Sequence, residues 1–162
     1  MLAFLVARDL CAQAVVPEIP AVLYSGGPIP ELTIEDADAA DMPAWWRAAV
    51  QATVTSTAVD EGALPERIRP TVRVVTEHLA RYPFPDFDSD LPMEVRELIA
   101  DVMEERSRAS AGPLHVALYL LPTTEPFTLR IGERAMLGDY GLVHDAARVG
   151  TALTELLRPE QP

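Results

Sequence analysis

Proline marks the places where the helices and strands of this chain begin or end. The chain has 15 prolines among its 162 residues, and a proline inside a helix or a central strand removes a backbone donor. Pro17 follows an Ala- and Leu-rich segment at residues 2–15, Pro83 ends a later helical pattern, and Pro113 separates the helices from an apolar segment. The chain is therefore predicted to consist of short elements joined by tight turns.

Apolar residues recur at helical spacing in four segments that follow the first one. Asp41 precedes the first of these and is expected to cap it. Pro70 lies inside the next pattern, so that helix either kinks or begins at the proline. Together with the N-terminal segment, the predicted helices cover residues 2–15, 42–54, 68–82, 92–109 and 142–156.

Two segments near the C-terminus predict a hairpin. Residues 114–121 are apolar on both faces, which is typical of a central strand. Residues 127–131 alternate apolar and polar side chains, as a half-exposed strand does. The five residues 122–126 turn the chain between them. We therefore expect a C-terminal hairpin at residues 114–131.

The order of these elements predicts the fold class. Short strands are also expected at residues 21–24 and 31–34. A helix, short strands, three helices, a hairpin and a last helix make an α+β protein with about five helices and a small mixed or antiparallel sheet. The length suits one compact domain over residues 1–162.

Acidic residues dominate the charge of the chain. The formal net charge is −12, which repels phosphate backbones and anionic membranes. The apolar N-terminus has no basic start of a signal peptide, and Arg8 and Asp9 interrupt it. No run approaches the ~18 apolar residues of a membrane span. We expect a cytoplasmic protein with neither a nucleic acid nor a membrane as partner.

All 13 basic residues are arginine, and asparagine is absent as well. Lysine and asparagine, the two missing residues, both use codons that begin with AA, so this bias indicates a high-GC bacterial genome. It excludes a Schiff-base lysine and a P-loop lysine. No GxSxG elbow and no GxGxxG fingerprint occur. We expect no cofactor.

Acid–base chemistry has a few candidate residues in the loop at 132–141 and just after it. They are Glu133, Asp139, His144 and Asp145. A histidine beside a carboxylate can act as acid and base, so a small hydrolase that uses His144 or His78 is one hypothesis. The structural interpretation is that Asp139 caps the last helix and that Asp145 pairs with Arg148 on the surface.

An acidic segment has the spacing of a calcium loop. Asp86, Asp88, Asp90 and Glu97 match positions 1, 3, 5 and 12 of an EF-hand. Leu91 stands where the sharp turn needs glycine, so we interpret the segment as a solvated loop in which Asp90 or Ser89 caps the next helix. His78, His115 and His144 match no zinc spacing. No metal is expected, and calcium at these carboxylates is the alternative.

The two tryptophans are adjacent, and neighbouring helical positions point about 100° apart. Met42, Trp45 and Trp46 are therefore our candidates for a surface that binds a protein partner or a second copy, the alternative being that they form core only. The leading hypothesis is a non-enzymatic interaction or self-associating module. The alternatives are the small hydrolase and an acidic inhibitor or immunity-type protein that binds a basic target.

Overall fold

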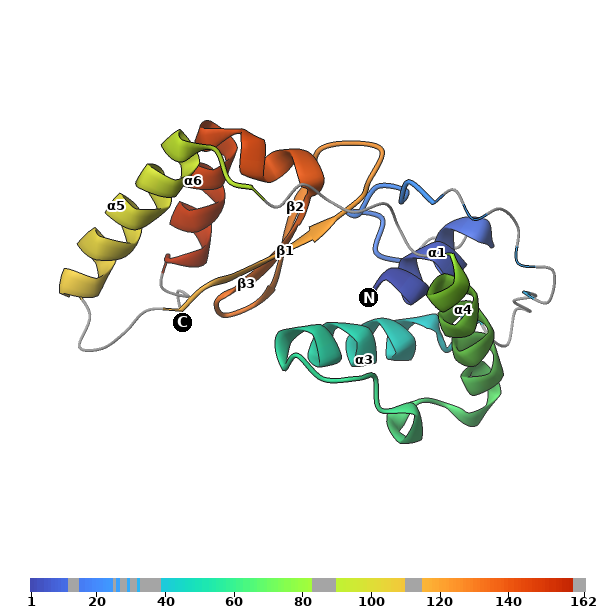
Figure 1. Ribbon diagram of the computed structural model, residues 1–162. Helices are drawn as coiled ribbons and strands as arrows, with labels where there is room; N and C mark the ends of the chain where they lie inside the picture. The colour runs from blue at the N-terminus through green and yellow to red at the C-terminus, as the bar shows by residue number, and fades with distance from the viewer. Residues whose placement is uncertain are drawn as a thin grey trace. The chain divides into compact units, whose positions relative to one another are not determined.

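The computed structural model shows an α+β protein (Figure 1). Its described residues form five α-helices and one three-stranded mixed sheet, so the predicted fold class is confirmed. Contacts divide the chain into two compact units: unit 1 comprises Met1–Pro17 and Ala21–Asp86, and unit 2 comprises Glu18–Pro20 and Phe87–Pro162. The extent of a single domain over 1–162 stays a prediction. The structure describes residues 1–11, 15–24, 26, 29, 32, 39–82, 90–109 and 115–158.

Unit 1 is helical. Its elements are α1 (Leu2–Leu10), α3 (Met42–Val54), η1 (Glu61–Ala63), η2 (Glu66–Ile68) and α4 (Arg69–Arg81). The helices α3 and α4 both contact α1. The apolar side of α1 is buried with that of α3 and α4, which gives the unit its core. Buried members include Phe4, Leu5, Met42, Trp45, Ile68, Val72 and Val75.

The ends of these helices refine the sequence predictions. Pro70 lies in the first turn of α4, which begins one residue earlier at Arg69, so the proline marks the start of the helix and not a kink. Asp41 precedes α3 but makes no side-chain cap. Its carboxylate instead pairs with Arg67 at 3.0 Å. The predicted cap by Asp41 is therefore wrong, because the 3-10 turn η2 brings an arginine to the carboxylate.

The predicted strands of the N-terminal half are nearly absent from the described residues. In segment 21–24 only Val22 forms a strand-like bridge, and its N–H donates to Asp9 Oδ2 at 2.7 Å. Of segment 31–34 the structure describes Leu32 alone, which lies in no strand. The N-terminal helix ends at Leu10, and residues 12–14 of its predicted range lie outside the described part.

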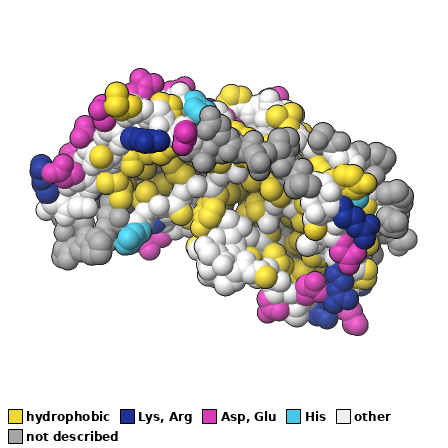
Figure 2. All heavy atoms as spheres, viewed as in Figure 1, with side chains coloured by type: hydrophobic (Ala, Val, Ile, Leu, Met, Phe, Trp, Pro, Cys, Tyr) yellow, Lys and Arg dark blue, Asp and Glu magenta, His cyan; other side chains and the backbone are white. Residues whose placement is uncertain are grey.

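Unit 2 is the α+β part of the chain. Helix α6 packs on one face of the sheet, and α5 packs against α6. On the face drawn in Figure 2, hydrophobic side chains gather inside this unit, while acidic and arginine side chains follow its rim over α5. No helix of the described ranges has the length and the apolar content to cross a bilayer. The elements are α5 (Met93–Ala109), β1 (Ala117–Leu121), β2 (Thr128–Gly132), β3 (Ala135–Asp139), η3 (Tyr140–His144) and α6 (Ala146–Leu156).

The sheet has the order β1-β3-β2, with β1 parallel and β2 antiparallel to β3. The predicted hairpin at 114–131 is therefore wrong: both of its strands exist, but β3 lies between them. The prediction that the first strand is central is wrong as well, since β1 is an edge. The central strand is β3, and all five of its residues are buried.

The hairpin of the structure joins β2 to β3 through Glu133 and Arg134. The pairing shifts register between Arg130 and Gly132, which is a bulge. The Arg130 side chain donates to the carbonyl oxygens of Gly132 at 3.1 Å and Glu133 at 2.6 Å, and to that of Glu155 in α6 at 3.3 Å. One arginine thus ties the tight turn to the end of α6, which favours this hairpin over the longer connection from β1.

Candidate functional site

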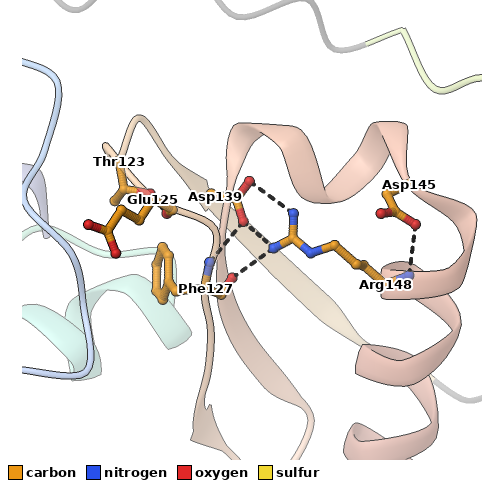
Figure 3. Close-up of polar contacts among 6 residues, drawn as sticks. All are labelled: Thr123, Glu125, Phe127, Asp139, Asp145 and Arg148. Atoms are coloured by element: carbon orange, nitrogen blue, oxygen red, sulfur yellow. Dashed lines mark hydrogen bonds and ion pairs between the residues drawn. The ribbon is translucent and has the colours of Figure 1, made fainter.

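An ion pair between Asp139 and Arg148 joins three elements of unit 2 (Figure 3). Arg148 Nη1 donates to Asp139 Oδ1 at 3.2 Å, and Arg148 Nη2 contacts Asp139 Oδ2. The N–H of Phe127 donates to Asp139 Oδ2 at 3.1 Å, and Arg148 Nη2 donates to the Phe127 carbonyl at 3.4 Å. The pair therefore fixes the end of β3, the start of α6 and the segment just before β2.

The environment of Asp139 keeps its carboxyl ionised. Burial raises the pKa, but hydrogen bonds from the Arg148 side chain and the Phe127 N–H, together with the charge of Arg148, lower it by more. The net result is a pKa below the ordinary value. Such a carboxylate is a poor proton acceptor near neutral pH, which argues for a structural role of Asp139.

Asp145 caps α6. Its Oδ1 accepts from the backbone N–H groups of Ala147 at 3.0 Å and Arg148 at 3.1 Å. The sequence predicts that Asp139 caps this helix and that Asp145 forms a surface ion pair with Arg148. Both assignments are wrong: the 3-10 turn η3 delays the start of α6 to Ala146, so that Asp145 stands at the cap and the guanidinium of Arg148 reaches back to Asp139.

The other acid–base candidates do not converge on this pair. Glu133 is exposed in the turn that precedes β3, whereas Asp139 ends that strand. The intervening strand spans about 13 Å at ~3.3 Å per residue. Glu133 contacts Arg134 at 3.9 Å. His144 is exposed at the end of η3. Of the four candidates, only Asp139 and Asp145 lie beside the same arginine, Arg148. Each of the two already has a structural role.

Two of the residues proposed for a partner surface lie in the core of unit 1. Met42 is fully buried, and Trp45 is 1% exposed. Trp46 is half-buried. The Phe4 ring meets Trp45 edge-on at a centroid distance of 5.6 Å and Trp46 at 5.3 Å. Both tryptophans therefore pack against Phe4 of α1. Of the three proposed residues, only Trp46 is partly exposed to solvent.

The calcium candidates are only partly covered by the structure. Asp86 and Asp88 lie outside the described residues. The Asp90 side chain is 91% exposed and lies 4.0 Å from Arg96, and Glu97 is exposed on α5. Within the described ranges, no three His, Cys, Asp or Glu residues gather in a way that could hold a metal ion.

Two depressions border α6. One of about 340 Å³ lies beside Phe127 and Arg148, and Arg148 is the charged member of its described lining. The other, about 600 Å³, lies between α5 and α6, with Leu98 and Val102 on one wall and Glu155 and Arg158 at its rim. Among the described lining residues of the two depressions no histidine lies beside a carboxylate, which is the arrangement that an acid–base site needs.

The outer edge of β1 is the feature that sequence reasoning missed. In a parallel ladder, alternate residues direct both backbone groups to the neighbour. Ala117 N donates to Arg134 O at 2.9 Å, so the odd-numbered residues of β1 face β3. Leu118 and Leu120 therefore direct their N–H and C=O groups outward. No strand pairs with this edge anywhere in the described part of the chain.

The outer edge of β1 is apolar, and its row of backbone donors stops at Pro122. Ala117 to Leu121 carry no charge, and the first four of these residues are half-buried. Leu118 and Leu120 pack toward the core under α6. Pro122, the next residue with the outward parity, has no N–H to offer. In the sequence, an apolar strand stopped by proline was the available signal of an edge, but the apolar character alone suggested a central strand.

Comparisons with known protein families, with curated proteins and with solved structures found no match for this chain. The functional argument therefore depends on the geometry of the site itself.

Proposed function

We propose that this protein is a cytoplasmic, non-enzymatic interaction module that binds an extended segment of a partner along the outer edge of β1. The observation that carries the proposal is the outward row of backbone N–H and C=O groups at Leu118 and Leu120, to which no described strand is paired. An added strand would satisfy these groups by the mode in which peptides extend a sheet.

The chemistry of the edge supports binding over passive exposure. Proteins that keep an edge strand from pairing place charges, especially lysine, or a bulge on it. β1 has neither a charge nor a bulge, and its register with β3 is regular. Each backbone hydrogen bond to a partner contributes about 0.5–1.5 kcal/mol, and the apolar side chains of Leu118 and Tyr119 add burial.

The hydrolase hypothesis has less support. It requires a histidine and a carboxylate that converge in a pocket. Asp139 is bound by Arg148, Asp145 caps α6, and Glu133 lies at the other end of β3. The hypothesis of an acidic inhibitor requires a basic partner. It predicts an affinity for that partner that falls steeply as the salt concentration rises.

A displayed library of random linear peptides tests the proposal. Peptides selected on the wild-type protein are expected to be extended and apolar at alternate positions, and to slow amide exchange at Leu118 and Leu120. Leu120→Pro removes an outward donor together with the side chain that packs under α6, whereas Leu120→Ala removes the side chain and keeps the donor. Leu120→Pro should abolish binding, and Leu120→Ala should retain it. Leu23→Pro, at an exposed loop residue of unit 1, is the matched control and should bind normally. Peptides that bind Leu120→Pro as well as wild type would overturn the proposal.

A further inference from the structure

We infer that the groove between α5 and α6 binds an amphipathic helix of a partner protein whose polar side chains are basic. The groove is the depression of about 600 Å³ that has Leu98 and Val102 on one wall. The two helices contact each other and lie side by side in Figure 1. This surface is distinct from the outer edge of β1, so the inference goes beyond the proposed function and does not depend on it.

The described walls of the groove expose apolar surface. On α5, Leu98 and Val102 are only half-buried, so a ligand in the groove would take them out of water. On α6, the groove is lined by a stripe of small residues spaced three or four apart, which are Ala147, Gly150, Thr151 and Thr154. This stripe extends over about 10 Å, or two helical turns. The groove therefore has the length and the open floor that a short helix needs.

The groove offers no row of backbone groups with which an extended segment could pair. Its walls are two helices, whose backbone groups bond within each helix. Thr151 Oγ1 donates to the carbonyl of Ala147 at 3.0 Å, and Thr154 Oγ1 donates to that of Gly150 at 2.8 Å, so both hydroxyl protons are used within α6. A helix satisfies its own backbone and needs only an apolar face to enter such a groove. The chemistry of the walls therefore favours a helix as the occupant.

Acidic side chains border the groove on the side of α5. Three exposed acids lie one helical turn from the apolar wall of this helix, and they are Glu94, Asp101 and Glu105. Val95 and Ile99 flank the same wall on its opposite side and belong to the core, so the three acids stand on the solvent side. Arg108, the arginine of α5 on that side, forms an ion pair with Glu104. The rim along α5 is therefore negative.

These charges determine which polar residues the bound helix carries. The described lining adds one acid, Glu155, and one base, Arg158, so the negative charge of the rim is not cancelled. Lysine or arginine beside the apolar stripe of a partner helix would pair with the rim acids. The net charge of −12 attracts a basic partner at long range and repels a second copy. Charge complementarity therefore selects a basic helix.

A displayed library of helical hairpins with one randomised helix face tests the inference. Helices selected on the wild-type protein are expected to carry lysine and arginine beside an apolar stripe. They should shift the amide resonances of Gly150 and Thr154 and leave those of Leu118 and Leu120 unchanged. Their affinity, measured by fluorescence anisotropy, should fall at least tenfold between about 0.05 and 0.5 M NaCl because salt screens the charges of the rim.

A bulky side chain in the groove tests the position of the bound helix. Thr154→Trp fills the groove from an exposed position, so it should weaken binding of the selected helices at least tenfold while the protein stays folded by circular dichroism. Thr76→Trp makes the same substitution at an exposed position of α4. It is the matched control and should bind as wild type does.

Reversal of the rim charges tests the chemistry of the partner. Asp101→Arg/Glu105→Arg should weaken binding at least tenfold. Glu66→Arg/Glu77→Arg, at two exposed positions of unit 1, makes the same change in net charge and is the matched control. At about 0.15 M NaCl, where charges interact over only ~8 Å, the control should weaken binding less than threefold.

Four outcomes overturn the inference. The first two are a library that yields no helix bound at Gly150, and selected helices that bind Thr154→Trp as tightly as wild type. The third is a set of helices without basic residues, or with equal affinity for the two charge variants. The fourth is a wild-type dimer in sedimentation velocity that Thr154→Trp dissociates, since a second copy would then occupy the groove. The β1 edge is tested separately by the linear peptides and Leu120→Pro.

Discussion

Arg148, in the first turn of α6, holds the carboxylate of Asp139 at the end of β3 and at the same time reaches the carbonyl of Phe127 before β2. The side chain of Asp139 is 9% exposed and that of Arg148 is 28% exposed, so water screens the pair only in part. Three elements that are separate in the sequence therefore depend on one ion pair.

Replacing one partner of this pair is expected to destabilise the protein measurably. Asp139→Asn keeps the size of the side chain but leaves the guanidinium of Arg148 without its counter-charge. We expect the free energy of unfolding to fall by about 2 kcal/mol, below the ~3–5 kcal/mol of a fully buried pair because Arg148 is partly exposed. Urea unfolding followed by circular dichroism measures the change. Glu133→Gln, in an exposed turn, is the control and should shift the midpoint little.

The same pair predicts a loss of stability in acid. The pKa of Asp139 in the folded protein lies below its ordinary value of 3.8, so the folded state binds its proton less readily than the unfolded state does. The contribution is present above the ordinary value and is lost as the pH falls through the folded pKa. Urea midpoints between pH 7 and pH 2 should show wild type losing more stability below about pH 4 than Asp139→Asn loses. Parallel curves would contradict the role of the pair.

Two aspartates that precede helices should respond differently to truncation. Asp145→Ala removes a cap that accepts from Ala147 and Arg148, and should cost about 1 kcal/mol. Asp41→Ala removes only an ion pair to Arg67, whose side chain is 60% exposed, and should cost less than about 0.5 kcal/mol. Thermal unfolding of the two variants compares them directly. A larger loss for Asp41→Ala would contradict the assignment of the caps.

The two adjacent tryptophans are expected to contribute unequally to the stability of the folded protein. Trp45 is buried against Phe4, whereas Trp46 is half-buried on the next helical position. Trp45→Ala should lower the free energy of unfolding by about 4 kcal/mol, since it opens a cavity in the core of unit 1. Trp46→Ala should lower it by less than half as much. In Trp46→Phe, the remaining emission should be blue-shifted relative to wild type because it comes from the buried ring.

The helices were predictable from the sequence because their signal is local. Apolar residues at helical spacing located α4, α5 and α6, and Pro70 marked a start that the structure places at Arg69. A proline and a periodic stripe act within one or two turns, so a single sequence contains the information. The helix ends were less predictable, because η3 shifted the start of α6 and gave the cap to Asp145.

The sheet was not predictable because its order depends on packing. Ala135 to Asp139 contain no β-branched residue and lie between glycines, which is typical of a loop. They form a strand because β1 and β2 pair with both of their edges. The same rearrangement moved β1 from the centre to an edge. It therefore hid the candidate binding site, whose residues are ordinary leucines.

The position of β3 in the chain also determines when the sheet can form during synthesis. Both outer strands precede it in the chain, and within the described residues each pairs with no strand but β3. During synthesis, which proceeds from the N-terminus at about 5–20 residues per second, β1 and β2 leave the ribosome before either has a partner. The sheet assembles only after Asp139 has emerged, and α6, which follows at once, then closes over it. For that interval β1 lacks the strand to which it pairs in the folded chain, so its apolar residues stay exposed to water until β3 arrives.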